Sequence, residues 1–183
     1  MTEQVTAPKK LPGWVYGGVF GCLVIISWTG WNAHRANQKL KEAFGGESHF
    51  RCVKDAGRVY ATRLAPAPGA KSPTGKLDEF VASAEPFEIS PELSQRLKEL
   101  LLSSDSYEWD VAHTCIPLYG YRLRFACEGK SVEAWVCLEC GLVEFVVDGK
   151  SVGGGIVTPV ERELKEVSIE LFPGDQAIED VEK

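Results

Sequence analysis

The sequence predicts an α+β domain behind an N-terminal transmembrane helix, with helices packed on an antiparallel sheet. Three observations predict it: an uncharged apolar segment, a period-two alternation of apolar residues after Tyr119, and amphipathic helices beginning near Ser90 and Thr158. The expected order of elements in the domain is β-β-α-β-β-β-α. With 183 residues, the chain is long enough for one such domain and an appendage.

The first element is the apolar segment, residues 11–31. Its 21 residues carry no charge, and a helix that crosses a bilayer needs about 20. Aromatic side chains lie near both ends of it, which is typical of the two membrane interfaces. They are Trp14, Tyr16, Trp28 and Trp31. We therefore expect an uncleaved signal anchor after an N-terminal tail, residues 1–10, with the lipid bilayer as its partner.

Other properties of this segment are left open by its sequence. Counting basic residues alone slightly favours a cytoplasmic domain, because more of them follow the segment than precede it. The signal-anchor form favours an extracytoplasmic domain instead, and this is the placement we expect. The stretch "VFGC" partly resembles a lipobox, so lipidation at Cys22 is an alternative to a plain anchor. Gly13, Gly17 and Gly21 lie four apart, a spacing that permits a homodimer through close helix packing. The alternative is that glycine is simply common in membrane helices.

The helix is expected to continue out of the membrane over residues 32–46. Gly45 and Gly46 end it, because glycine is the usual residue at a helix stop. The α+β domain then spans residues 47–175, and an acidic tail, residues 176–183, follows it.

Two strands open the domain. The first is expected within residues 48–65, where Val59 is at the centre of a strand-like run. Residues 66–75 are rich in Pro and Gly and predict a loop. The second strand, within residues 76–89, contains Pro86, which is compatible only with a sheet edge or a bulge.

The helix that follows has a well-marked start. Ser90 can cap it, Pro91 fits its first turn, and Glu92 suits the positive end of the helix dipole. One apolar stripe follows, made of Leu93, Leu97, Leu100 and Leu101. Helix and sheet are therefore expected to pack through this stripe.

The last helix is expected to begin at Thr158. Thr158 and Glu161 have the spacing of a capping box, with Pro159 in the first turn. Its apolar stripe consists of Val160, Leu164, Val167 and Leu171. Pro173 and Gly174 end the helix.

Between these helices, period-two alternation predicts a hairpin and a third strand. The turn "EGKS", with its two central residues at the tip, sets the register of the hairpin. That register places Arg122 opposite Cys137 and Tyr119 opposite Cys140. The third strand is "LVEFVV", and "DGKSVGGG" leads away from it.

Four side chains are expected to meet at this end of the sheet: His113, Cys115, Cys137 and Cys140. They can form a zinc site, because zinc takes tetrahedral sulfur and nitrogen ligands and Cys-x-x-Cys-Gly between strands is typical of a zinc knuckle. The alternative is a structural disulfide from Cys115 to Cys137 or Cys140. A redox pair is a third possibility, which a strand rather than a helix after Gly141 disfavours.

The segments "HTCIPLYGYRLRF" and "VEAWVCLECGLVEF" resemble a group of uncharacterised bacterial envelope and lipoprotein-like proteins. The shared pattern is Cys-x-Pro, at Cys115 and Pro117, followed by Cys-x-x-Cys at Cys137 and Cys140. Leu138 departs from it, since a Phe is usual there. The resemblance implies an extracytoplasmic setting and no assigned activity.

Composition and motifs bound the function. A net charge of −6 gives nucleic-acid binding no electrostatic support, and no phosphate-binding or serine-nucleophile motif occurs. We expect no catalytic residues, and the sequence leaves the cofactor open, with zinc as one possibility. The expected function is a single-pass, membrane-anchored envelope protein with a non-enzymatic binding or structural domain. The alternative is a metal-binding or thiol-redox protein acting through Cys115, Cys137 and Cys140.

Overall fold

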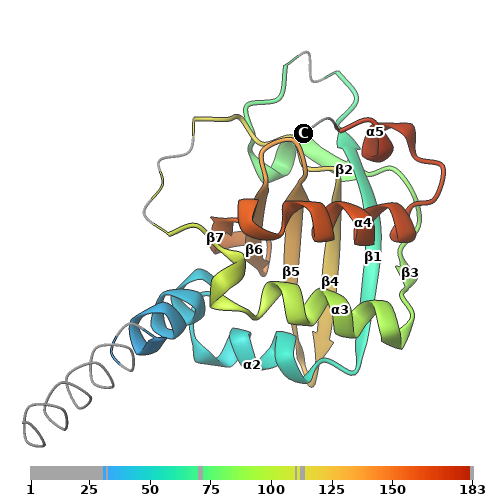
Figure 1. Cartoon of the computed structure of the whole chain (residues 1–183). Coiled ribbons are helices and arrows are strands. Elements are labelled where there is room, and N and C mark those ends of the chain that lie inside the picture. Colours follow the sequence, from blue (N-terminus) through green and yellow to red (C-terminus); the bar gives the residue numbers. More distant parts are fainter. Residues whose placement is uncertain (1–30, 32, 70–71, 110, 112–113, 182–183) are drawn as a thin grey trace, which may run out of the picture. The chain divides into compact units, whose positions relative to one another are not determined.

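The computed structural model describes residues 31, 33–69, 72–109, 111 and 114–181. The chain forms two compact units, Met1–Asn37 and Gln38–Lys183. The second unit is an antiparallel sheet with helices packed on it, so the predicted α+β class is confirmed (Figure 1).

A helical stretch at residues 33–43 precedes the labelled elements. The helices are α2 (Glu47–Asp55), α3 (Pro91–Leu101), α4 (Glu161–Leu171) and α5 (Gln176–Glu179). The strands are β1 (Arg58–Pro66), β2 (Phe80–Ala82), β3 (Phe87–Glu88), β4 (Tyr121–Cys127), β5 (Lys130–Cys137), β6 (Leu142–Val147) and β7 (Lys150–Ile156).

The predicted transmembrane helix, residues 11–31, lies outside the described residues except for Trp31. Within the described ranges, no helix combines the length and the apolar character needed to cross a bilayer. The predictions for Cys22 and for Gly13, Gly17 and Gly21 also lie outside the described residues.

The sheet has the strand order β2-β1-β4-β5-β6-β7, and β3 also pairs with β1. All its neighbouring strands are antiparallel. Helices α3 and α4 run across one face of it, and α2 lies at one end of the strands (Figure 1). The alternation along each strand sends one set of side chains into this helix-covered core and the other set to the opposite face.

The core between sheet and helices is apolar and close-packed. Among its fully buried strand residues are Val59, Ala61, Tyr121, Leu123, Phe125, Val132, Ala134, Val136, Val143 and Phe145. The helices contribute Val53, Leu97, Leu101, Leu164 and Val167. A smaller cluster on the opposite face consists of Leu64, Phe80, Tyr119, Trp135, Cys137 and Val146. The sheet is therefore covered by apolar contacts on both faces at the end that carries Cys137.

The start of the domain differs from the prediction. Residues 47–55 form α2, and the strand begins only at Arg58. The burial pattern explains the helix: Cys52 and Val53 face the core, whereas Arg51 and Lys54 are exposed. Within β1 the expected strand around Val59 is confirmed.

The second predicted strand is broken, as Pro86 leads one to expect. β2 and β3 are two short strands on the β1 edge, separated by the residues around Pro86. A proline lacks the N–H that a continuous ladder needs, so the strand is interrupted there.

The two predicted helices begin in different ways. Ser90 caps α3, because its Oγ accepts a hydrogen bond from the Leu93 N–H at 3.2 Å. The predicted capping box at Thr158 is wrong: Thr158–Val160 form a 3-10 turn, and α4 begins at Glu161 with no side-chain cap. Backbone hydrogen bonds of that turn, including Val160 N to Val157 O, take the place of the cap.

β7 was not predicted, since Gly153, Gly154 and Gly155 carry no strand signal. The segment is a strand through its pairing with β6, and the close approach of neighbouring groups explains why glycine stands at these positions. A Cβ on Gly154 would lie 2.4 Å from the Val143 carbonyl oxygen, and one on Gly155 would lie 2.5 Å from the Tyr107 ring.

The predicted hairpin register is also wrong by two positions. Glu128 and Gly129 are the turn residues, and Arg122 lies opposite Trp135 instead of Cys137. Gly129 has φ +67°, a conformation that glycine adopts without strain, so it fixes the turn one residue earlier than expected. A shift of two keeps every side chain on its predicted face, because the strand period is two.

The C-terminal segment assigned to an acidic tail contains α5. Its Ile178 is 2% exposed and belongs to the core. Burial of this single apolar residue fastens the segment to the domain.

Candidate functional site: a three-cysteine cluster at one end of the sheet

The Cys-x-x-Cys stretch forms the turn between β5 and β6. Cys137 is the last residue of β5 and pairs with Leu142, the first residue of β6. Cys140 lies in the turn, which is closed by a hydrogen bond from Gly141 N to Leu138 O at 3.1 Å. The expectation that a strand follows Gly141 is confirmed.

A disulfide joins Cys140 to Cys115. Their Cα atoms are 6.0 Å apart, within the usual range for a disulfide. This pairing is one of the two that the sequence leaves open for Cys115. The bond ties the connection that enters β4 to the β5–β6 turn.

A second disulfide joins Cys52 in α2 to Cys127 at the end of β4. It closes 75 residues of sequence and lies in the core, where Cys52 is 7% exposed. Sequence reasoning missed this pairing because the segment around Cys52 reads as part of a strand. The helical burial of Cys52 beside Val53 is the signal that would have found it.

Cys137 is the free cysteine of the described residues, and it is fully buried. Its sulfur accepts a hydrogen bond from the Leu118 N–H at 3.3 Å. The backbone N–H groups of Cys140 and Glu139 also donate to it. Burial raises the pKa of the Cys137 thiol, and the three N–H donors act in the opposite direction.

The zinc prediction requires His113, Cys115, Cys137 and Cys140 to be free for a metal. Cys115 and Cys140 are bonded to each other, and His113 lies outside the described residues. Across the described part of the chain, no three or more His, Cys, Asp or Glu side chains are grouped to hold a metal ion. Of the predicted alternatives, the structural disulfide therefore describes Cys115 and Cys140 in this structure.

The register correction changes how the cluster assembles. Arg122 lies opposite Trp135, and Tyr119 precedes Tyr121, where the pairing of β4 with β5 begins. Neither residue therefore lies opposite a cysteine. Instead Gly120 N donates to Val136 O at 2.9 Å, and the preceding residues run beside the β5–β6 turn. This path brings the Leu118 N–H onto the Cys137 sulfur.

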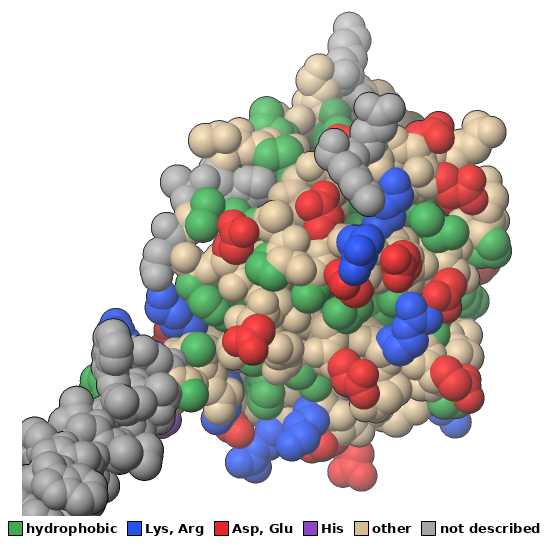
Figure 2. All heavy atoms as spheres, in the orientation of Figure 1, with side chains coloured by type: hydrophobic (Ala, Val, Ile, Leu, Met, Phe, Trp, Pro, Cys, Tyr) green, Lys and Arg blue, Asp and Glu red, His purple; other side chains and the backbone are tan. Residues whose placement is uncertain are grey.

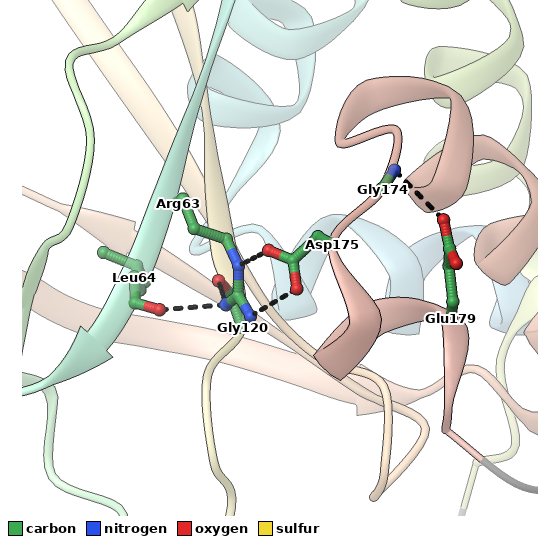
Figure 3. Close-up of polar contacts among 6 residues, drawn as sticks. All are labelled: Arg63, Leu64, Gly120, Gly174, Asp175 and Glu179. Carbon is green, nitrogen blue, oxygen red and sulfur yellow. Dashed lines mark hydrogen bonds and ion pairs between the residues drawn. The ribbon is translucent and has the colours of Figure 1, made fainter.

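Arg63 makes hydrogen bonds and an ion pair at the end of the sheet that carries the cysteines (Figure 3). Its Nη1 donates to the carbonyl oxygens of Leu64 and Gly120, and its Nε lies 2.5 Å from Asp175 Oδ2. Arg63 therefore ties β1, the start of β4 and the loop before α5 together. Its hydrogen bond to the Asp175 carboxylate holds the pKa of that carboxyl below its usual value.

On the sheet face opposite α3 and α4, the charged side chains pair with each other. Arg122 lies 3.3 Å from Glu133, and its guanidinium is 5.8 Å from the centroid of the Trp135 ring. Trp135 Nε1 donates to Glu133 Oε2 at 2.9 Å. Arg124 lies over the ring of Tyr60, at 5.0 Å from its centroid. These groups satisfy one another across the strands.

The connection from Val111 to Leu118 carries exposed apolar side chains. Val111 is 52% exposed, Ile116 58% and Leu118 40%. By contrast, acidic and basic side chains are interspersed over the face drawn in Figure 2. Ile116 and Leu118 follow Cys115 closely in sequence, so the disulfide ties the stretch that carries them to the β5–β6 turn.

No protein-family model matches this chain, and no curated protein or solved structure matches it either.

Proposed function

We propose that this protein is a single-pass, membrane-anchored protein of the bacterial envelope, with an extracytoplasmic, non-enzymatic binding domain. The observation that carries the proposal is the connection around Cys115, whose exposed apolar side chains are fastened to the β5–β6 turn by a disulfide.

The two disulfides support the placement of the domain. Disulfides persist in oxidising compartments and are rare in the bacterial cytosol. Four cysteines of the domain, Cys52, Cys115, Cys127 and Cys140, are paired in this way. The uncharged segment 11–31 has the length of a helical membrane anchor.

The pairing of the charged groups supports a role without catalysis. Asp175 is paired with Arg63, and Glu133 with Arg122, in contacts that join elements of the fold. The Cys137 thiol is buried and has a raised pKa, and a nucleophilic cysteine needs a lowered one. These groups are used for structure.

The apolar connection supports a binding role. Ile116 and Leu118 stand on either side of Pro117, which limits the backbone freedom of this stretch. Together with the Cys115 disulfide, the proline presents the two side chains in a preorganised form, which lowers the entropy cost of binding. An apolar surface of this kind fits an apolar patch on a protein partner.

The placement is tested with alkaline phosphatase, which is active only outside the cytoplasm, fused to the C-terminus of the full chain in a bacterial host. Activity in the membrane fraction is the expected result. A matched fusion to a cytoplasm-active fluorescent protein should be dark. Active fluorescent protein with inactive phosphatase would place the domain in the cytoplasm and overturn the proposal.

The binding surface is tested by photo-crosslinking in the same host. A crosslinking amino acid is placed at Ile116 of the full chain, with Lys130, the first residue of β5, as the control position, exposed but away from the cluster. One discrete adduct from position 116 that is absent from position 130 supports binding there. Identical adducts from both positions, or none from position 116, reject this surface.

A further inference from the structure

The sulfur of Cys137 has more polar contacts than a buried thiol needs. N–H groups of Leu118, Glu139 and Cys140 all donate to it. A neutral thiol is a weak acceptor and packs in a core without such donors. Convergent backbone N–H groups instead form the kind of nest that stabilises an anion, including the sulfur of a metal-bound thiolate.

Two of the three N–H donors of this nest lie in the β5–β6 turn. The donors from Glu139 and Cys140 belong to the two residues that complete Cys-x-x-Cys after Cys137 and Leu138. Cys140 is partly buried and packs against the cluster of buried side chains that contains Cys137. The turn therefore presents two sulfurs on one side, which is the arrangement that a zinc knuckle uses.

The sulfurs of Cys115 and Cys140 can bind a metal only when the disulfide between them is reduced. Cys115 is exposed and Cys140 half-buried, so a dithiol in solution can reach their bond. In the exchange, the dithiol gives two electrons and two protons and becomes a disulfide, and Cys115 and Cys140 become thiols. In the Cys52–Cys127 bond, Cys52 is 7% exposed and Cys127 is half-buried, so this bond is less accessible to the same attack than one with an exposed cysteine.

We propose that reduction of the Cys115–Cys140 bond by a dithiol turns this cluster into a binding site for a thiophilic divalent cation of the Zn²⁺ class, with Cys115, Cys137 and Cys140 as ligands. Each thiol loses its proton on binding, and water takes the fourth position. Sulfur atoms at about 2.3 Å from a tetrahedral zinc ion are about 3.7 Å from each other. The two sulfurs of the broken disulfide need to separate by only about 2 Å to reach that spacing. The proposal does not depend on the membrane placement or on a protein partner.

The first experiment titrates Co²⁺, a spectroscopic substitute for Zn²⁺, into the full chain in detergent micelles. One sample is oxidised, and the other is reduced with a phosphine, which is then removed without air. The reduced chain should bind one Co²⁺ with thiolate-to-cobalt charge-transfer absorption, and the oxidised chain should show none. Equal binding by both samples, or none by the reduced chain, would overturn the proposal.

Substitutions assign the ligands. Cys137→Ser in the reduced chain should weaken Co²⁺ binding by roughly 100-fold, since even residues that only support a ligand change affinity by 10- to 100-fold. Cys127→Ser, which also removes one thiol but from the other disulfide, should change it by less than about 3-fold. Equal weakening by both variants would show unspecific thiol binding.

A measurement on the unmodified chain does not depend on the folding of a variant. Zn²⁺ is added to the reduced chain before alkylation with iodoacetamide, and the labelled peptides are quantified by mass. Protection of Cys115, Cys137 and Cys140 together on addition of Zn²⁺ is expected. Uniform labelling with and without Zn²⁺ rejects the site.

Discussion

Arg63 and Asp175, which are 112 positions apart in sequence, form a two-pronged ion pair, with Nε to Oδ2 at 2.5 Å and Nη2 to Oδ1 at 3.3 Å. Their side chains are only 19% and 25% exposed. The remaining Nη1 is directed at carbonyl oxygens of Leu64 and Gly120. A single guanidinium thus holds three segments that meet beside the cysteine cluster.

We predict that Arg63→Met lowers the free energy of unfolding by about 2–3 kcal/mol, because it leaves the partly buried Asp175 carboxylate without its cationic partner and removes one donor from the Leu64 and Gly120 carbonyl groups. Urea unfolding of the full chain in micelles measures this. The control is Arg96→Met: Arg96 pairs with Glu170 at side-chain exposures of 45% and 51%. That variant should cost less than about 1 kcal/mol. Equal effects of the two substitutions would show that Arg63 is an ordinary surface cation.

Asp175 gives the same contact a pH dependence. Its pKa in the folded chain lies below 3.8, chiefly because Arg63 donates to its carboxylate. The stabilisation is therefore complete above the unfolded pKa near 3.8 and is lost as the pH falls through the lower folded value. Asp175→Asn should unfold with a flatter dependence on pH between about 5 and 2 than the unmodified chain. Parallel curves for the two proteins would contradict this assignment.

The two disulfides should differ in their effect on stability. The Cys52–Cys127 bond spans 75 positions and the Cys115–Cys140 bond spans 25. Loop-closure entropy then gives about 4.5 and about 3.5 kcal/mol respectively. Cys127→Ala should also leave a thiol in the core, so it should lower the unfolding free energy more than Cys115→Ala does. Urea titration of both oxidised variants checks the order, and the reverse order would contradict it.

The Tyr121 and Ser168 hydroxyls form a buried hydrogen bond, and Ser168 has a second hydrogen-bond partner. The hydroxyls are 2.7 Å apart, and Ser168 also donates to the Leu164 carbonyl oxygen at 2.6 Å. Ser168→Ala leaves the buried Tyr121 hydroxyl without its partner and should cost about 1–3 kcal/mol. Tyr121→Phe leaves Ser168 bonded to Leu164 and should cost about 1 kcal/mol or less. Thermal unfolding compares the two, and a larger loss for Tyr121→Phe would show that the tyrosine hydroxyl has a further partner.

The glycines of β7 should tolerate no side chain. A Cβ on Gly154 would meet the Val143 carbonyl oxygen at 2.4 Å, a backbone group that cannot rotate away. Gly154→Ala should therefore lower the unfolding free energy by about 1–3 kcal/mol or more, and detach the β7 edge. Gly57→Ala is the control, since nothing lies within 4 Å of its added Cβ. Hydrogen exchange of the β6 and β7 amides should increase in Gly154→Ala alone; unchanged exchange there would show that the strand can shift to make room.

Local signals in the sequence predicted what depends on neighbouring residues. Ser90 followed by Pro91 gave the start of α3, because a cap is formed by residues three positions apart. Alternation gave the faces of β4 and β5, and even a register error of two positions left those faces unchanged. Pro86 gave the break between β2 and β3.

Predictions failed where distant groups determine the outcome. β7 has a sequence that disfavours strands; it is a strand through its pairing with β6, and Val143 and Tyr107 leave room only for glycine there. The capping box at Thr158 failed because a 3-10 turn supplies the hydrogen bonds instead. Neither Val143 nor Tyr107 is near these glycines in sequence, so no local pattern records the constraint.

By itself, the sequence determined the α+β class and the apolar face of the central hairpin. Only the tertiary structure decided which sulfurs bond. Cys140 reaches Cys115, Cys52 reaches Cys127, and Cys137 is left among backbone N–H donors. The reason is physical: a disulfide requires Cα atoms within about 7 Å, and that distance is fixed by packing rather than by spacing along the chain.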